Sequence, residues 1–468
     1  MEFGDWSLDL IPGDTSSLKG IDSTHAFKIL LSDLPSSKLV FLLCDSSALT
    51  ILRFFQLFEA RVPVALIDAN ITPERLGALV HSYQPDLIIG LSERLLPPEL
   101  NYLPTPINGV WNVSKPNGGE IHPDLAVLLS TSGSTGSQKF VRLSRSNILR
   151  NAEQIAQSLN IAAGNRAITT LPFHYSFGMS VATSHAARGA ALVVTDKSII
   201  TPDFWEIMNS QNVTFLVGVP QTFTMFKRLD FESKDLTSLE VLAQAGGKLS
   251  DALITYFHDS MIKRGGNFHV MYGQTEASPR ISCLPSADIP SKLGSVGLPV
   301  AGGSLQVLDA EGTELGPRSV GEIQYEGPNV MMGYTESRVD LHQGDLHNSV
   351  LKTGDLGYLD EDGYLFLVGR SKRIAKIAGS RVSLDEIESL LQSIVDGPFA
   401  AVSSLEFDDI TAFSSEVATE EVASIRQKLA RMLGVPPKLI NLRKVEAIPY
   451  LSNGKIDYSL LEDWARER

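Results

Sequence analysis

A segment rich in serine, threonine and glycine has the clearest chemical use in this chain. An apolar run, Ala126 to Leu129, predicts a strand that leads into it, and a helical pattern begins beyond Ser146. Glycines let a backbone approach a polyphosphate closely, while hydroxyl and amide groups donate hydrogen bonds to it. A lysine at the end adds a positive charge for phosphate. The segment comprises Ser130, Thr131, Ser132, Gly133, Ser134, Thr135, Gly136, Ser137, Gln138 and Lys139.

This segment predicts a phosphate-binding loop. It differs from the Walker pattern because Lys139 lies three residues past Gly136 instead of directly after it. Taken alone, a cluster of serine, threonine and glycine is equally compatible with a solvated surface loop. Other motifs along the chain therefore decide between the two interpretations.

Three further motifs carry groups that suit a nucleotide. Residues 272–276 supply an aromatic ring, a glycine, a hydroxyl and the carboxylate of Glu276, and a carboxylate oxygen is a good ligand for phosphate-bound Mg²⁺. Asp355, after Thr353 and Gly354, can accept hydrogen bonds from two ribose hydroxyls. Lys455 lies in a loop beside a glycine. Each motif alone also fits an ordinary turn or a solvated side chain.

In this order, the motifs resemble those of the adenylate-forming superfamily, which contains acyl- and aryl-CoA synthetases, adenylation domains of nonribosomal peptide synthetases and firefly luciferase. The resemblance runs from about residue 125 to the C-terminus, and the first ~120 residues carry no signature. It implies an AMP-forming ligase that activates a carboxylic acid with ATP. The other matching segments are Leu171 to Met179, Ala245 to Gly247, Gly321 to Tyr334, Gly369-Arg370, Lys376 to Arg381, Glu386 to Glu388 and Asn453 to Lys455.

The resemblance assigns a role to each matching residue. Lys455 is the expected catalytic residue, bridging the substrate carboxylate and the α-phosphate, with Thr275 touching phosphate and Glu276 holding Mg²⁺. Tyr272 is expected to pack on adenine, and Asp355 and Arg370 to contact the ribose. The expected ATP- and AMP-binding residues are Thr131, Ser132, Gly133, Ser134, Thr135, Gly136, Lys139, Gly246, Gly247, Tyr272, Gly273, Asp355 and Arg370.

The expected acid pocket departs from that of amino-acid-activating relatives. Those proteins carry an aspartate that pairs with the substrate ammonium, and Gly178 stands at that position here. Because a buried ammonium without a counter-ion is costly, an α-amino acid is disfavoured as the substrate. Tyr175 and Phe177 suggest an apolar or aromatic pocket, although both rings also fit a plain core. The expected pocket residues are Tyr175, Phe177, Gly178 and Ala245.

The acceptor of the acyl group is expected to be a pantetheine thiol, either of CoA or of a carrier-protein phosphopantetheine. The segment Asn453 to Asp457 resembles peptide-synthetase adenylation domains and suggests the carrier protein. Lys372 occupies the expected hinge, and Lys376 and Gly379 are expected to serve the second half-reaction. Two alternatives remain open: an amide-forming ligase with an amine acceptor, and a non-catalytic homologue that binds ATP or an acyl group.

The elements that position these motifs follow from the apolar pattern. Short apolar runs, among them the predicted strands 40–43, 191–195 and 214–219, alternate with helical patterns over the first ~360 residues. This alternation predicts an α/β architecture of layered sheets and helices. Before Gly369-Arg370, residues 321–325 and 364–368 are expected to be strands joined through the turn Asp360 to Gly363. After it, the pattern changes to two helices, 383–393 and 419–433. With 468 residues, more than one domain is expected. We predict a large N-terminal domain over 1–370, carrying the acid and ATP sites, and a small mobile α+β domain over 371–468 carrying the catalytic lysine.

Composition narrows the partners. The net charge of −14 argues against nucleic acid, since binding to its phosphates depends on basic surface. No apolar stretch approaches the ~18 residues that a membrane span needs. The start of the chain lacks the layout of a signal peptide. The two cysteines, Cys44 and Cys283, are expected to be free thiols, and a cytoplasmic location is predicted.

Overall fold

The structure is a computed structural model. The chain divides into two compact units, and each unit is described separately. The first unit comprises Met1–Ser132, Ser137–Ser304 and Glu326–Leu351, and the second includes Leu305–Tyr325 and Lys352–Arg468. The predicted boundary near residue 370 is not tested by this division and stays a prediction. Within these ranges the structure describes all residues except 1, 4–5, 14–26, 28–30, 32–37, 91–101, 106, 108, 114–118, 131–138, 371–372, 378–379, 396, 405–408, 419, 434, 452–453 and 467–468.

The first unit contains two eight-stranded sheets. In one sheet β4, β5, β6 and β9 run parallel, and β10 turns back antiparallel to β9. The residues of β4 and of the first five positions of β9 are fully buried, as expected for a parallel sheet covered on both faces. In sheet order the strands are β20 (Gly333–Thr335), β10 (Phe140–Ser144), β9 (Leu125–Ser130), β5 (Val64–Asp68), β4 (Val40–Cys44), β6 (Leu87–Ile89), β8 (Val110–Val113) and β7 (Tyr102–Pro104).

The other eight-stranded sheet is parallel from β3 to β15 and ends in two antiparallel strands. Its strands β12 and β13 confirm the predicted runs 191–195 and 214–219 to within one residue at each end. In sheet order the strands are β17 (Leu298–Pro299), β16 (Arg280–Leu284), β15 (Asn267–Gly273), β14 (Val241–Gln244), β13 (Phe215–Gly218), β11 (Arg166–Ile168), β12 (Ala191–Val194) and β3 (Asp9–Pro12). A separate pair is formed by β1 (Glu2–Phe3) and β2 (Trp6–Ser7).

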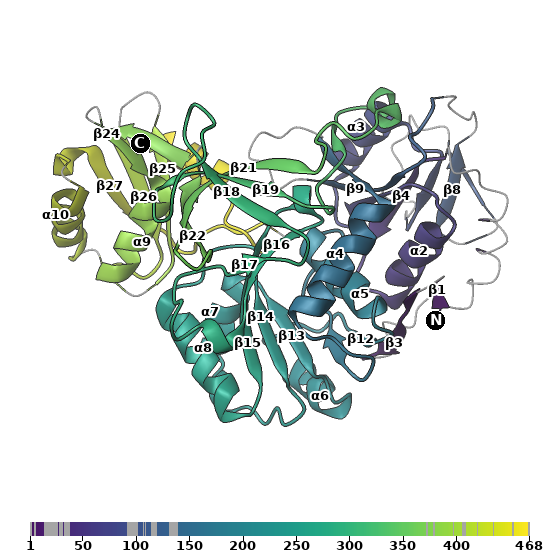
Figure 1. Cartoon of the computed structure of the whole chain (residues 1–468), viewed down its shortest axis with the longest axis horizontal. Coiled ribbons are helices and arrows are strands. Elements are labelled where there is room, and N and C mark those ends of the chain that lie inside the picture. The colour runs from purple at the N-terminus through teal and green to yellow at the C-terminus, as the bar shows by residue number, and fades with distance from the viewer. Residues whose placement is uncertain are drawn as a thin grey trace. The chain divides into compact units, whose positions relative to one another are not determined.

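Two central helices connect the sheets of this unit. Helix α4 contacts strands of both eight-stranded sheets, and α5 packs beside it (Figure 1). Ser144 begins α4 with a capping box, because its hydroxyl accepts from the amide of Asn147 while the Asn147 side chain accepts from the amide of Ser144. The helices are α2 (Ala48–Glu59), α3 (Pro73–Tyr83), α4 (Arg145–Ser158), α5 (Ser176–Ala186), α6 (Pro202–Ser210), α7 (Pro220–Arg228) and α8 (Asp251–Lys263).

The second half of the chain adds smaller sheets. We expected the turn Asp360 to Gly363 to join the strands 321–325 and 364–368, and this is wrong. The turn joins β22 to a strand that the pattern did not reveal, β21, which lies between β19 and β22 in the sheet. The sequence of β21 mixes small, polar and apolar residues because the strand is only partly buried. It therefore lacks the regular apolar pattern by which a strand is recognised. The sheet is β18 (Ser304–Leu308), β19 (Gly321–Glu326), β21 (Val350–Leu359) and β22 (Leu365–Arg370).

The C-terminal part is α+β, and both predicted helices are present as α9 and α10. The core contains Ile387 and Leu391 of α9, which face Ile410 and Ala412 of β26 in one apolar cluster. The elements are β23 (Ile374–Ile377), β24 (Ser380–Ser383), α9 (Leu384–Ile394), β25 (Phe399–Ser404), β26 (Asp409–Ser414), α10 (Val422–Leu433), β27 (Ile440–Lys444) and α11 (Tyr458–Arg466). The predicted α/β class, with layered sheets and helices followed by an α+β part, is confirmed.

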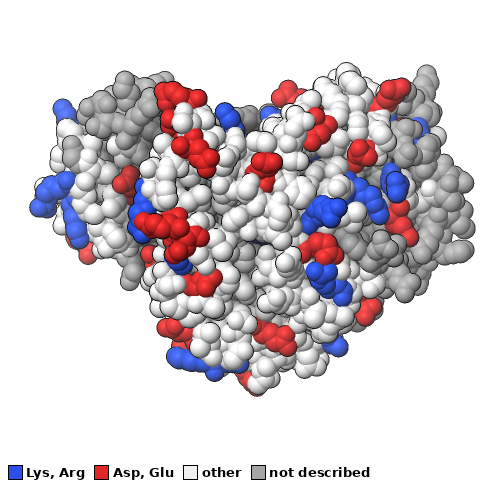
Figure 2. Space-filling model, in the orientation of Figure 1, with Lys and Arg blue, Asp and Glu red and all other residues white. Residues whose placement is uncertain are grey.

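The surface carries charge of both signs. On the face drawn in Figure 2, the described lysines and arginines lie scattered among acidic side chains. None of the helices that the structure describes is long and apolar enough to span a bilayer. Cys44 and Cys283 are buried free thiols, as predicted.

Candidate active site

Two paired strands flank the serine- and threonine-rich segment. Ser130, the last residue of β9, pairs directly with Phe140, the first residue of β10. The predicted phosphate-binding residues 131–136 lie outside the described residues, whereas Lys139, directly before β10, is described.

Lys139 belongs to a cluster that also contains Tyr334 and Glu276. The Lys139 ammonium lies 3.5 Å from the centroid of the Tyr334 ring, and the Tyr334 hydroxyl donates to Glu276 Oε1 at 2.8 Å. Burial and the Glu276 carboxylate raise the pKa of the Tyr334 hydroxyl, which keeps it protonated as the donor. The structure thus brings a predicted phosphate-binding lysine to the ring of Tyr334 and the predicted magnesium ligand to its hydroxyl.

The backbone holds Glu276 in place. Thr275 and Glu276 lie in a short 3-10 helix, Thr275–Ala277, and the Glu276 carbonyl accepts from the Met331 amide at 2.8 Å. Gly273, at the end of β15, has no room for a side chain, because a Cβ there would lie 1.9 Å from the Pro279 carbonyl oxygen. Tyr272 is buried in β15 opposite Ser282. The predicted nucleotide motif is therefore a tight hairpin whose shape requires its glycine.

A hydrogen bond links this hairpin to the expected acid pocket. Ser176, the first residue of α5, has its hydroxyl 3.1 Å from the Thr275 hydroxyl. Nearby, Gly246 has φ +88°, and a Cβ on it would lie 3.0 Å from the Tyr175 hydroxyl. Two predicted sites, the phosphate side at Thr275 and the acid side beginning at Tyr175, thus meet within the first unit.

The remaining pocket residues follow strand β14 and helix α5. Ala245 is buried, and the Gly247 carbonyl accepts from the Gln244 side chain at 2.7 Å. Phe177 is also buried, with the Arg280 guanidinium carbon 4.9 Å from its ring centroid. Packing alone explains a glycine at position 178, because a Cβ there would lie 2.2 Å from the Pro172 carbonyl oxygen. The glycine at this position therefore does not by itself identify the acid.

We expect Gly178→Ala to destabilise the protein. The added methyl group must displace the Pro172 backbone, and overpacking of this kind costs about 1–3 kcal/mol. Gly164→Ala is the matched control, since nothing lies within 4 Å of a Cβ at Gly164. Denaturant unfolding of both variants measures the effect, and equal free energies of unfolding would show that the Gly178 site has room for a side chain.

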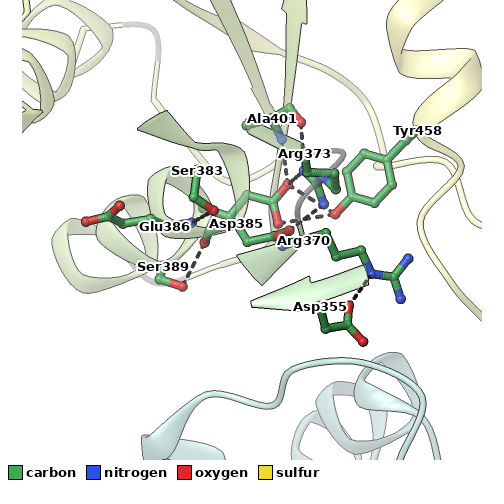
Figure 3. Close-up of polar contacts among 10 residues, drawn as sticks. Asp355, Arg370, Arg373, Ser383, Asp385, Glu386, Ser389, Ala401 and Tyr458 are labelled. Carbon is green, nitrogen blue, oxygen red and sulfur yellow. Dashed lines mark hydrogen bonds and ion pairs between the residues drawn. The ribbon is translucent and has the colours of Figure 1, made fainter. Parts of the chain in front are cut away.

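In the second unit, the two predicted ribose ligands lie side by side. Asp355 and Arg370 are paired across β21 and β22, and Arg370 Nε lies 3.0 Å from Asp355 Oδ1. Figure 3 shows the two side chains joined as an ion pair. The Thr353 hydroxyl accepts from the Asp355 amide at 3.1 Å, which helps to fix the backbone of this Thr-Gly-Asp motif within β21. The pair presents a carboxylate and a guanidinium together, as the ribose assignment needs.

Both described neighbours of the expected hinge are held by Asp385 at the start of α9. The Arg370 amide donates to Asp385 Oδ2 at 3.0 Å, and Arg373 Nη1 lies 2.7 Å from Asp385 Oδ1 (Figure 3). Arg373 also pairs with Glu388 at 2.7 Å and lies 3.8 Å above the Tyr458 ring. Lys372 itself and Gly379 lie outside the described residues. Lys376 pairs with Arg381 across β23 and β24, and its side chain is not described.

Lys455 lies in a tight turn near the C-terminus. Its carbonyl accepts from the Leu451 amide at 2.8 Å, and Tyr450 and Ile456 form an isolated bridge beside it. Gly454 has φ +76°, a conformation that glycine adopts without strain. The turn therefore holds the lysine on a fixed backbone.

Three residues of the site were not assigned from the sequence. Tyr334 links Lys139 to Glu276, Ser176 contacts Thr275, and Arg280 lies against Phe177. Tyr334 and Ser176 fall inside segments that matched the superfamily, so their polar side chains were the available signal. Arg280 offered none, because an arginine at a strand start usually faces solvent.

Comparison with known proteins places this site in a family context. The family model described as AMP-binding enzyme matches residues 29–335. A probable 4-coumarate–CoA ligase 3 of Dictyostelium discoideum is 28% identical over 363 residues, covering 74% of this chain and 64% of the relative. A 2-succinylbenzoate–CoA ligase of Bacillus velezensis is 30% identical over 329 residues, covering 67% and 66%. The chain thus spans slightly less than two thirds of the length of these relatives.

Solved structures show the same fold. An o-succinylbenzoate CoA synthetase from Bacillus subtilis, in complex with its acyl-adenylate intermediate, is 20% identical with a TM-score of 0.77, covering 97% of this chain and 95% of that one. An anthranilate CoA ligase in complex with anthranoyl-AMP is 20% identical with a TM-score of 0.80, covering 98% and 94%.

Proposed function

Because the chain belongs to the AMP-binding enzyme family, we propose that it is an AMP-forming ligase for a carboxylic acid. It activates the acid with ATP and passes the acyl group to a thiol, either of CoA or of a carrier-protein phosphopantetheine. The observation that carries the proposal is the 3.1 Å contact between Ser176 and Thr275. This contact joins the segment assigned to the acid with the segment assigned to phosphate, and adenylation needs both reactants within reach of each other.

In the first half-reaction, a carboxylate oxygen of the acid attacks the α-phosphorus of ATP, and the bond to pyrophosphate breaks. Lys139 and the serine- and threonine-rich segment bind the leaving pyrophosphate, and Lys455 stabilises charge on the α-phosphate and the acid. Glu276 is the residue that would hold Mg²⁺, which supplies positive charge to the phosphates. One carboxylate fits this role, since Mg²⁺ in such sites takes its other ligands from phosphate and water.

In the second half-reaction, a thiolate attacks the acyl carbonyl carbon. The bond between that carbon and the phosphate oxygen breaks, and AMP leaves. Lys376 and Gly379 are assigned to this step by resemblance, with Gly379 leaving space for the pantetheine arm. Lys372 is the proposed pivot that exchanges Lys455 for this segment, and its neighbours Arg370 and Arg373 are anchored to Asp385.

We expect Lys372→Pro to separate the half-reactions. Proline would fix φ at 372 and restrict residue 371, which limits rotation at the hinge. Thioester formation should fall by about tenfold or more, equal to about 1.4 kcal/mol in the barrier, while pyrophosphate exchange stays largely intact. Both rates are measured on one preparation with an unchanged melting curve. Equal loss of both would remove residue 372 from the role of pivot.

Non-amino acids are the expected substrates. Gly178 stands where the resemblance puts the aspartate that pairs with the ammonium group of an amino acid, so a bound α-amino acid would lack that counter-ion. In ATP–pyrophosphate exchange, acyl and aryl acids should exceed α-amino acids by at least about tenfold, which corresponds to about 1.4 kcal/mol. Efficient exchange with a free amino acid would contradict this expectation.

Pyrophosphate exchange and analysis of the product together address the alternatives. A non-catalytic homologue would bind ATP or an acyl group without exchange for any acid. An amine acceptor would give an amide product, whereas a thiol acceptor gives a thioester, and the two differ in their sensitivity to neutral hydroxylamine. We place the reaction in the reducing cytoplasm, supported by the free thiols of Cys44 and Cys283.

A further inference from the structure

Arg373 directly follows the proposed hinge, and its guanidinium is enclosed within the second unit. Its side chain is only 16% exposed and pairs with both Asp385 and Glu388. Nη2 also donates to the Ala401 carbonyl at 2.9 Å, and Figure 3 shows the side chain between Ala401 and the Tyr458 ring. The residue after the hinge is therefore fastened to α9, β25 and α11 at once.

The Glu388 carboxylate receives hydrogen bonds from three parts of the unit. Its Oε1 lies 2.7 Å from Arg373 Nη2 and accepts from the Ala401 amide at 2.8 Å. The Tyr458 hydroxyl lies 3.1 Å from Oε1 and 3.2 Å from Oε2. Burial and this carboxylate raise the pKa of the Tyr458 hydroxyl, so it stays protonated as a donor. Glu388 thus ties the residue after the hinge to the first residue of α11.

Helix α11 begins three residues after Lys455, and the backbone between them is held. The Lys455 carbonyl accepts from the Leu451 amide, and the Asp457 amide donates to the Pro449 carbonyl at 2.9 Å. The Lys455 turn, residues 449–457, is therefore closed at both ends by main-chain hydrogen bonds. A displacement of Tyr458 would be passed on to Lys455 through this closed turn.

Apolar packing also supports the turn, but it fixes position less sharply. Ile456 lies in one apolar cluster with Ala400 and Val402 of β25. Apolar contacts have no preferred direction, whereas hydrogen bonds do. The bond from Tyr458 to Glu388 therefore adds the directional contact that sets where the Lys455 turn lies on β25.

We propose that Glu388 and Tyr458 are positioning residues for Lys455 in the first half-reaction. They fix the lysine relative to the hinge, so that a rotation at residue 372 delivers its ammonium to the acid and the α-phosphate. The contacts form one series, from Arg373 through Glu388 and Tyr458 to the Lys455 turn. The inference rests on the proposed function and deepens it.

The segment assigned to the second half-reaction is held in a different way. Strands β23 and β24 pair with each other, and Lys376 belongs to this pair. The pair leads directly into α9, where the Ser383 hydroxyl accepts from the Glu386 amide at 3.4 Å (Figure 3). Because these contacts do not include Tyr458, loss of its hydroxyl should impair the step that uses Lys455 and spare transfer to the thiol.

The test compares Tyr458→Phe with the wild type in the two half-reactions. The substitution keeps the ring beneath Arg373 and removes only the hydroxyl. In ATP–pyrophosphate exchange, kcat should fall by about tenfold to 100-fold, because a small misplacement of a catalytic group has an effect of that size. The KM for ATP should be unchanged, as expected for an interaction made only in the transition state. Thioester formation from preformed acyl-adenylate and CoA should keep the wild-type rate.

A double variant tests whether the two residues act through one link. Glu388→Gln should lower exchange at least as much as Tyr458→Phe, because it also weakens the contact with Arg373. Since both substitutions break the same series of contacts, the double variant should lose no more than about twofold beyond Glu388→Gln alone. Tyr358→Phe is the matched control, since Tyr358 lies in β21 of the same unit with its ring stacked on Phe366. It should keep the wild-type exchange rate.

Hydrogen exchange of the Gly454 and Asp457 amides gives a readout that is independent of activity. These amides donate to the Leu451 and Pro449 carbonyls, and Tyr458→Phe should raise their exchange rates by about tenfold through local opening of the turn. Tyr358→Phe should leave these rates unchanged.

Two results would overturn the inference with the proposed function intact. One is an unchanged kcat for pyrophosphate exchange in Tyr458→Phe, and the other is an equal loss of both half-reactions together with a lower Tm, which would make the contacts merely structural. Absence of pyrophosphate exchange with every acid in the wild type would instead count against the proposed function. Hydrogen exchange would then still decide whether Tyr458 holds the Lys455 turn.

Discussion

Replacing Lys455 with alanine is expected to abolish adenylate formation while ATP binding survives. The turn around Lys455 is held by main-chain contacts, at Leu451 and between Tyr450 and Ile456, so removal of the side chain should leave the backbone in place. Loss of one charged contact to a transition state costs about 3–4 kcal/mol, which is about 1,000-fold in rate. ATP–pyrophosphate exchange measures the loss, and nucleotide binding is measured on the same preparation.

Lys438→Ala is the matched control for this variant. Lys438 is an exposed lysine of the same unit, in the short helix Pro437–Leu439. It should keep the wild-type exchange rate. Unchanged exchange in Lys455→Ala would remove Lys455 from the catalytic role, and loss of ATP binding in that variant would make it a nucleotide ligand instead.

Glu276→Gln is expected to lower exchange by about 100- to 1,000-fold, since removal of one preorganised electrostatic contact costs about that much. The amide oxygen of glutamine can still accept the hydrogen bond from Tyr334, so the local fold should persist. The substitution removes the negative charge of the carboxylate that is proposed to hold Mg²⁺. The rate is measured across a magnesium titration, in which the variant should need more magnesium to reach half of its maximal rate.

Glu336→Gln provides the control, because Glu336 is exposed and lies two residues from Tyr334. Its magnesium titration should match that of the wild type. A Glu276→Gln enzyme with a lower maximal rate and an unchanged magnesium midpoint would assign Glu276 to positioning of Tyr334 and Lys139. A wild-type rate would exclude both roles.

Strands and helices that are determined by their own residue pattern could be predicted from the sequence. A run such as Val40 to Leu43 is apolar at every position, and only a strand buried on both faces uses such a run at that length. The helix after Ser383 follows from its N-cap and its apolar spacing. Strand β21 was not predicted because its residues are only partly buried and show no clear alternation of apolar and polar positions. Pairing with the neighbouring strands β19 and β22 makes it a strand.

The sequence by itself determined the family resemblance and the kinds of groups available for phosphate, magnesium and ribose. Both inferences follow from the residue types in short motifs and from the order of these motifs, which can be read directly from the sequence. Only the tertiary structure decided which groups meet. Tyr334 reaches Glu276 across 58 positions of the chain, and Gly178 is required by the neighbouring Pro172 backbone. The burial of Arg280, whose Nε and Nη2 find no hydrogen-bond partner among the described residues, is also a tertiary fact, because exposure and pairing depend on the elements packed around a residue and not on its neighbours in sequence.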